Sequence, residues 1–304
     1  MQLSFKPRES DLVSASISNI IALIRPHQYV KNLFIFMPIF FVGQIGNVDL
    51  LLNALIAFIA FSLSASAVYV LNDYRDIEDD RLHPTKQNRP LASGAISSQT
   101  ALVLMVLLAV VGLGLMISLS RDAALILSAY VLMNIAYSFK LKHVAIIDVV
   151  IISIGFVLRL FIGSLVTGIP LSSWIVIMTF LLALFLALAK RRDDVLIFQQ
   201  TGQKMRQVID GYNLQLIDTA MTIMSAVVIV AYILYTKSAE SVARIGNENL
   251  YLTGLFVILG IMRYLQITFV EENSGSPTRI VLNDRFMQLT IIAWLATFGW
   301  MIYL

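Results

Sequence analysis

The chain has 304 residues, of which 58% are hydrophobic and only 13% are charged, and its formal net charge is +3. Soluble domains carry about 25% charged residues, so this composition excludes a soluble globular protein and indicates an integral membrane protein. The sequence contains no cysteine, which excludes disulfides, thiolate metal sites and cysteine nucleophiles.

The first 19 residues are polar and mixed in charge, and they lack the features of a signal peptide, so we expect a cytoplasmic N-terminal segment. Nine apolar stretches follow, each long enough to cross a membrane as a helix. They cover about residues 20–42, 50–71, 97–119, 122–139, 144–166, 172–190, 212–236, 250–270 and 286–303. Pro26 and Pro38 interrupt the first stretch, which predicts a kink there. The sequence therefore predicts an all-α, polytopic membrane protein in which residues 1–304 form one domain.

Lys and Arg residues fall mostly on one side of this expected topology. With a cytoplasmic N-terminus, 17 of the 22 lie on the cytoplasmic side and three on the opposite side, while Arg159 and Arg263 fall within spans. Cytoplasmic loops of membrane proteins carry an excess of Lys and Arg. The distribution therefore predicts an odd number of spans in the cell membrane, with the charged loops in the cytoplasm.

The stretch NDYRDIEDDRLHPTKQNRP, residues 72–90, follows the second expected span. It contains the pattern NDxxDxxxD, formed by Asn72, Asp73, Asp76 and Asp80. If the helix continues, the three aspartates share one face and repel one another unless a cation lies among them. Carboxylate oxygens suit Mg²⁺, which usually binds phosphate oxygens as well. The pattern therefore predicts a metal and phosphate site at the membrane surface.

The basic residues that follow, Arg81, Lys86 and Arg89, suit the phosphate charge that the metal leaves uncompensated. A solvated loop in which acids and bases pair with one another is the alternative. Two prolines restrict the path of the loop, and the acids abut a membrane helix, which favours the binding site.

NDxxDxxxD after the second of nine helices resembles the UbiA-type superfamily of intramembrane prenyltransferases. Within it, four further stretches look like decaprenyl-phosphate phosphoribosyltransferases: RPHQYVKN (25–32), YSFKLKHVAIIDVVIISIGFVLR (137–159), AKRRDD (189–194) and LNDRFMQLTIIAW (282–294). The resemblance covers nearly the whole chain. It implies a helical fold with a cavity open to lipid and cytoplasm, and Mg²⁺ bound by the aspartates. It also implies transfer of a 5-phosphoribosyl group from phosphoribosyl diphosphate (PRPP) to a polyprenyl phosphate.

The loop after the sixth span departs from ordinary prenyltransferases, which usually carry a second acidic motif of the DxxxD type there. Here we expect the loop to begin with Lys190 and Arg191, and the acids that follow lack that spacing. A basic cluster suits direct recognition of a further phosphate. An anchor that fixes the topology is the equal alternative.

Other polar residues flank the expected site. Lys31 could reach a phosphate from the first span, and Tyr137, Lys140 and Lys142 could contact diphosphate or ribose. Residues that snorkel to the membrane surface would look the same. Asp148 and Arg159 in the fifth span are costly in a membrane and lie three turns apart, about 16 Å, too far to pair directly. The sequence identifies no partner for Arg159.

These features together predict an enzyme that transfers a phosphoribosyl group from PRPP to a membrane-bound polyprenyl phosphate. The aspartates would hold Mg²⁺, and the anionic lipid phosphate would attack without a general base. A prenyltransferase with a prenyl diphosphate donor and an aromatic or other acceptor is the first alternative. A transporter or lipid-binding protein is the second. Nucleic acid is not an expected partner, and a homo-oligomer is compatible with the sequence.

Overall fold

The computed structural model describes residues 9–82, 86–202, 204, 206–273 and 277–303, and these ranges contain helices and no strands. Eight helical segments within them are long and apolar enough to cross a membrane. They are α3 (Val48–Arg75), α5 (Ser98–Leu119), α6 (Arg121–Phe139), α7 (Ile147–Thr167), α8 (Ser173–Thr201), α9 (Leu214–Lys237), η5 with α11 (Glu248–Phe269) and α13 (Arg285–Tyr303). The predicted all-α, multi-pass membrane protein is confirmed.

The first predicted span, residues 20–42, is divided into three pieces. Helix α1 (Glu9–Ile24) ends before Arg25, whose φ of 54° lies in the left-handed region. Pro26 then opens η1 (Pro26–Phe36), a 3₁₀ helix of 11 residues, and α2 (Met37–Phe41) follows. Long 3₁₀ stretches are uncommon because their hydrogen bonds are poorer than those of an α-helix. Side chains from α3 and α7 support this one, as described below.

The other boundaries fall close to the predicted ones, with one exception. Helix α8 does not end at Lys190 but continues to Thr201, where Gly202 adopts a left-handed conformation with φ of 69°. The prediction of a loop that begins at Lys190 is therefore wrong. The helix can carry this charged stretch because Arg191 and Arg192 find carboxylate partners on neighbouring helices.

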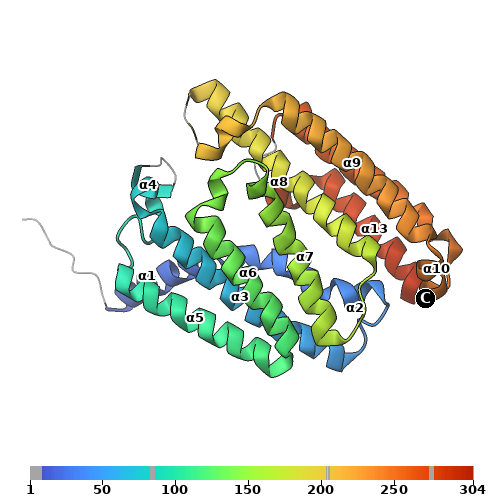
Figure 1. Ribbon diagram of the computed structural model, residues 1–304, viewed down its shortest axis with the longest axis horizontal. Helices are drawn as coiled ribbons and strands as arrows, with labels where there is room; N and C mark the ends of the chain where they lie inside the picture. Colours follow the sequence, from blue (N-terminus) through green and yellow to red (C-terminus); the bar gives the residue numbers. More distant parts are fainter. Residues whose placement is uncertain (1–8, 83–85, 203, 205, 274–276, 304) are drawn as a thin grey trace, which may run out of the picture.

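Short helices connect the spans: α4 (Ile77–Leu82), η2 (Lys86–Asn88), η3 (Leu141–His143), η4 (Gln207–Gly211), α10 (Ala239–Ile245) and α12 (Pro277–Asn283). Helices α4, η2, η3 and η4 lie at one end of the bundle, which we call the charged end; in Figure 1 it surrounds α4 and the tip of α8. Helices α2 and α10 lie toward the other end.

Helix α7 lies between two apolar cores. One core gathers side chains from α2, α3, α6 and α7, including Phe61 and Leu127, and the other gathers side chains from α8, α9 and α11. Helix α7 also contacts η1 closely at Gly163, where a Cβ would overlap the carbonyl oxygen of Ile35. Small residues permit such close approach between helices in membranes. The absence of a side chain at this position therefore fixes how near η1 lies to α7.

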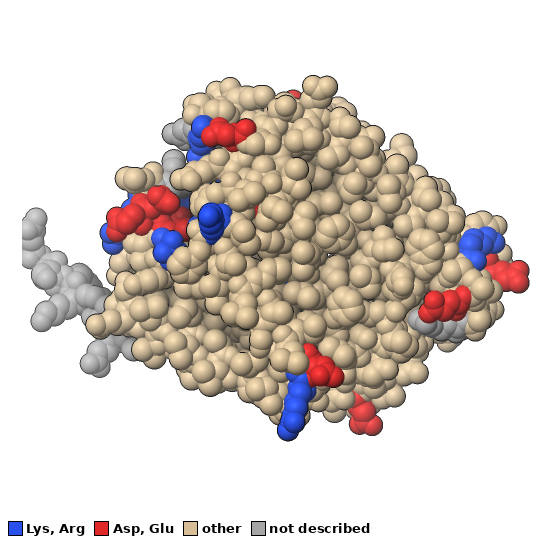
Figure 2. All heavy atoms as spheres, in the orientation of Figure 1, with Lys and Arg blue, Asp and Glu red and all other residues tan. Residues whose placement is uncertain are grey.

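Charged side chains on the face shown in Figure 2 form groups around α4, around α10 and at the lower edge, with a broad uncharged surface between these groups. This distribution fits a protein that spans a bilayer, because charges in the hydrocarbon region are costly.

The cysteine-free sequence allows the predicted orientation to be tested directly. We expect Lys86→Cys and Lys204→Cys to react with an impermeant maleimide from the same side of the membrane, and Glu248→Cys from the other side. The reason is that Lys86 in η2 lies close to Arg206, whereas Glu248 begins η5 beyond α9. Reaction of the two lysine replacements from opposite sides would contradict the topology.

Candidate functional site

Asp73 and Asp80 meet at the charged end, where two arginines neutralise them. Asp73 is the third residue from the end of α3 and is 3% exposed. Its Oδ1 accepts hydrogen bonds from Arg25 Nη2 at 2.5 Å and from Arg89 Nη1 at 3.1 Å. The same Arg89 atom donates to Oδ2 of Asp80, also buried, at 2.7 Å. The two carboxylates therefore share Arg89, which is the pairing of acids and bases that the sequence analysis gave as the alternative to a metal site.

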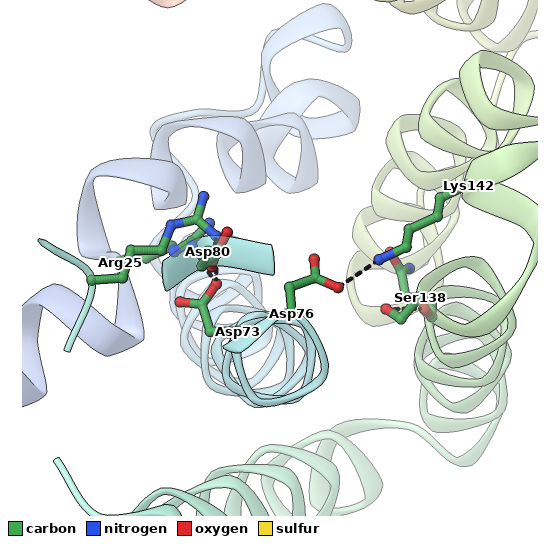
Figure 3. Close-up of polar contacts among 8 residues, drawn as sticks. Arg25, Asp73, Asp76, Asp80, Ser138 and Lys142 are labelled. Atoms are coloured by element: carbon green, nitrogen blue, oxygen red, sulfur yellow. Dashed lines mark hydrogen bonds and ion pairs between the residues drawn. The ribbon is translucent and has the colours of Figure 1, made fainter. Parts of the chain in front are cut away.

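Asp76 points away from this pair. It caps the end of α3, and the short helix α4 then continues the chain, so the three aspartates do not lie along one straight helix. Its Oδ1 accepts a hydrogen bond from Lys142 Nζ at 2.7 Å, on the other side of α3 from Arg25 (Figure 3). The predicted convergence of all three aspartates on one face is therefore corrected, and Asp76 instead connects α3 to η3.

A metal ion fits part of this arrangement. In the described part of the chain, no three His, Asp or Glu side chains gather closely enough to hold a metal by themselves. Mg²⁺ commonly takes one or two carboxylates together with substrate oxygens. Asp73 and Asp80 already share a cation, and the buried Oδ1 of neighbouring Asn72 has no hydrogen-bond partner. An oxygen left in this state is costly unless a ligand uses it.

The predicted basic residues of the loop have different environments. Arg89 bridges the acids, but Arg81 hydrogen-bonds Glu78 and the carbonyl of Ala92, and so holds the turn rather than facing the acids. Burial, with Arg206 and Arg89 nearby, lowers the pKa of Lys86, although the acids of the site also act on it. Lys86 therefore lies between the acids and the loop that carries Arg206.

Two lysines face the same region without forming an ion pair, although Asp193 and Asp194 lie close enough to attract Lys190. Lys31 on η1 and Lys190 on α8 make no hydrogen bond or ion pair with any described residue. They lie close enough to repel each other, and Arg206 adds to the repulsion on Lys190. Unpaired cations held near one another are unfavourable at the edge of a membrane unless an anion joins them. This arrangement is suited to a phosphate ligand.

Arg191, one residue further along α8, is in the opposite situation. Its side chain is 1% exposed, and Nε donates to Oδ2 of fully buried Asp148 on α7 at 2.5 Å. Its Nη1 donates to Asp194 at 3.0 Å, and Tyr137 on α6 lies nearby. This geometry favours a structural role for Arg191 over the direct phosphate contact that the sequence suggested. It also identifies the partner of Asp148.

The loop between α8 and α9 contacts the ion pair of Asp148 and Arg191 through hydrogen bonds. Tyr212 donates its hydroxyl hydrogen to Asp148 Oδ1 at 2.6 Å and accepts from the backbone N–H of Ile146 at 2.8 Å. Burial and the bond to Asp148 raise the pKa of this tyrosine. Arg206 in the same loop pairs with Asp194 at 3.2 Å. The contacts hold Arg206 beside Lys190, a position that no pattern in the sequence signalled.

Arg25 is a second residue that the sequence analysis did not single out, although it begins the stretch RPHQYVKN. Lys140, by contrast, was predicted to bind substrate but is exposed and makes no ion pair with a described residue. A cavity of about 560 Å³ adjoins α8 at Asp193 and is lined mainly by polar residues. The remaining lining residues are Ile267, Glu271, Asn273, Arg279, Ile280, Asn283 and Asp284.

Comparison with known proteins identifies the family of this chain. The model of the UbiA prenyltransferase family matches residues 32–292. The chain belongs to the UbiA prenyltransferase family. A UbiA homologue from Archaeoglobus fulgidus, whose structure was determined with DMAPP and Mg²⁺ bound, has the same fold, with a TM-score of 0.69 at 18% identity over 93% of this chain and 98% of that one.

Several relatives that are similar to this chain over nearly its whole length carry the same name. The decaprenyl-phosphate phosphoribosyltransferase of Mycolicibacterium smegmatis is 32% identical over 94% of this chain and 93% of that protein. The enzyme of the same name from Mycobacterium tuberculosis is also 32% identical, over 93% of this chain and 94% of that protein. The family and the predicted resemblance are confirmed.

The two neighbouring basic residues on α8 should respond differently to substitution. We expect Arg191→Ala to lower the free energy of unfolding by about 3–5 kcal/mol, because it leaves Asp148 buried without its cation. Arg191→Lys should recover only part of this loss, since an ammonium cannot reproduce two guanidinium bonds. Lys190→Ala is the control and should leave unfolding nearly unchanged. Denaturation in mixed micelles measures all three, and equal stability of the Arg191 and Lys190 variants would contradict the assignment.

Proposed function

We propose that this UbiA-family enzyme transfers a 5-phosphoribosyl group from PRPP to a polyprenyl phosphate at the cytoplasmic face of the cell membrane. The observation that carries the proposal is a pair of lysines that form no ion pair with a described residue, Lys31 and Lys190, facing a site whose other side is acidic. Two anionic substrates need more positive charge than a metal on Asp73 and Asp80 supplies. The names of the relatives from both mycobacterial species support the same donor and acceptor classes.

The acidic side is the proposed Mg²⁺ site. Asp73, Asp80 and the unpartnered oxygen of Asn72 would hold the ion, with Asp76 close behind on the same turn. A bound Mg²⁺ neutralises the diphosphate and makes it a better leaving group. Arg25 and Arg89 neutralise the acids in this structure, and their guanidinium groups suit phosphate oxygens equally well. The Mg²⁺-bound homologue from Archaeoglobus fulgidus supports a divalent cation.

The reaction replaces one bond at C1 of the ribose. The C1–oxygen bond to diphosphate breaks with its electron pair on the leaving diphosphate, and an oxygen of the lipid phosphate forms the new bond. The attacking oxygen is already anionic, so the site needs no general base. Lys31, Lys190 and Arg206 position the phosphates and stabilise their charge, which is the main form of catalysis in such transfers.

The α8 side of the site favours a sugar donor over a prenyl donor. In place of a second acidic motif it presents Lys190, with Arg206 beside it. The cavity at Asp193 on α8 is lined by carboxylate, amide and guanidinium groups together with Ile267 and Ile280, and its polar groups can hydrogen-bond ribose hydroxyls.

The decisive experiment offers both donor classes to the purified protein in detergent or nanodiscs. We expect radiolabel from PRPP to appear in a polyprenyl-linked product when polyprenyl phosphate and Mg²⁺ are present, and to disappear when EDTA is added. Prenyl diphosphate with aromatic acceptors, run in parallel, should yield no product. Product from the prenyl diphosphate reactions only would overturn the proposal in favour of an ordinary prenyltransferase.

Substitution of the acids tests the metal role. Asp73→Asn and Asp76→Asn should each lower kcat/KM for PRPP by about 100-fold or more, since loss of a well-placed ligand or its neighbouring charge costs several kcal/mol of transition-state stabilisation. Asp79→Asn, in the same loop but exposed, is the matched control and should retain activity. Titration of Mg²⁺ should show a raised requirement in the Asp73 and Asp76 variants. Near-normal turnover in both would contradict the assigned role.

A further inference from the structure

Arg159 is a buried cation near the middle of α7. Its side chain lies among three aromatic rings, with the guanidinium carbon 4.5 Å from the ring centroid of Phe61, 5.2 Å from that of Tyr130 and 5.3 Å from that of Phe156. The residue is 5% exposed. Aromatic faces attract a cation but leave its net charge in place.

The hydrogen bonds of Arg159 all go to neutral groups. Nε donates to Asn32 Oδ1 at 2.8 Å, Nη1 to the carbonyl of Gly155 at 2.6 Å, and Nη2 to the Tyr130 hydroxyl at a long 3.4 Å. No carboxylate among the described residues pairs with it. A charge in this position normally has an ionic partner or faces a functional cavity.

Asn32 connects this cation to the substrate side. Its amide oxygen accepts from Arg159, and its Nδ2 donates to Ser62 Oγ on α3 at 2.9 Å, so both ends of the amide are fixed. Lys31 is the preceding residue of η1, and Arg159 and Arg25 lie close enough to repel its ammonium group. Arg25 has Asp73 as its counter-ion, whereas Lys31 and Arg159 have none among the described residues.

We infer that Lys31 and Arg159 form the binding site for the phosphate of the lipid acceptor. Lys31 contacts the phosphate, and Arg159 is a positioning residue that acts through Asn32. The inference rests on the proposed function and divides its site into two phosphate positions. Arg159 supplies positive charge from behind and holds the η1 backbone that presents Lys31. A phosphate monoester on an apolar chain supplies the negative charge that Lys31 and Arg159 lack among the described residues.

The surroundings of Lys31 favour the acceptor over the donor. Its neighbours on η1, Val30 and Leu33, are each 48% exposed and apolar, so this wall of the site borders the lipid. Phe34 packs edge-on against Phe156 at a ring-centroid distance of 5.1 Å and continues the apolar surface. Lys190 instead lies beside Arg206, which approaches Lys86 and the acids where the donor diphosphate belongs.

The substitution Asn32→Asp separates charge from structure. An aspartate of the same shape keeps the bond to Arg159 Nε, and Ser62 can donate to it in place of accepting. The variant gives Arg159 an ionic partner, so the protein should remain folded with an unchanged or raised melting temperature. The positive charge behind Lys31 is then cancelled. A purely structural role for Arg159 predicts no loss of substrate affinity in this variant.

The test measures the KM for each substrate and, independently of turnover, the thermal shift caused by polyprenyl phosphate compared with the uncharged polyprenol. We expect Lys31→Gln, Asn32→Asp and Arg159→Gln to raise the KM for polyprenyl phosphate roughly 10- to 100-fold, as for loss of hydrogen bonds to a charged group. The KM for PRPP should change less than threefold. The extra stabilisation by the phosphate over the alcohol should fall in the same three variants. Lys237→Gln, at the far end of α9, is the matched control and should behave as wild type.

The outcomes distinguish the inference from the proposed function. If wild type turns over PRPP but Asn32→Asp binds the lipid phosphate normally, the assignment of Arg159 is wrong and the function stands. If these variants raise the KM for PRPP instead, Lys31 belongs to the donor position and the inference is overturned. If wild type forms no product from PRPP, the proposed function itself has failed. The double variant Lys31→Gln/Asn32→Asp should lose less than the sum of the single effects, because both act on one phosphate.

Discussion

Asp148 and Arg191 join α7 to α8 through an ion pair that meets no water, since their side chains are 0% and 1% exposed. Both charges are expensive to bury, and each is tolerable only because the other is present. Tyr212 adds a hydrogen bond to Asp148 and Asp194 adds one to Arg191, and these contacts hold the loop after α8 in place. The ion pair and its neighbours therefore fix the position of α8 relative to α7 at the charged end of the bundle.

Compensation of charge separates structural from functional residues in this protein. Arg191 and Lys190 are neighbours in sequence and both carry a positive charge, yet the helix turns Arg191 toward carboxylates that it contacts directly and leaves Lys190 without an ion pair. The same contrast holds between Arg25, which has Asp73, and Arg159, which has only neutral groups around it. Because an unpaired charge is costly in this medium, we propose that the buried residues without a counter-ion receive one from the substrate.

Composition and charge bias were sufficient to predict the spans, because the length of a membrane helix and the preference of Lys and Arg for one side are properties of short segments. The partners of charged side chains were not predictable in this way. Arg159 meets a residue 127 positions away, and Arg191 meets one 43 positions away, so their bonds depend on how the helices pack. The continuation of α8 past Lys190 has the same origin. Asp76 turned away from the other acids because α3 ends there, which a helical repeat cannot show.

Gly163 on α7 affects the position of Lys31 even though it does not contact that residue. Since η1 rests directly on this glycine through the backbone of Ile35, the width of one absent methyl group sets how deep the Lys31 segment sits. Natural variation at such a position would tune the enzyme through spacing without changing any polar group. A bulkier residue there would push η1 away from α7, and we would expect a compensating change in the size of the apolar residues of η1 rather than among the charges. If the wall around Lys31 binds the acceptor as proposed, side-chain volume at Gly163 would influence which acceptor fits.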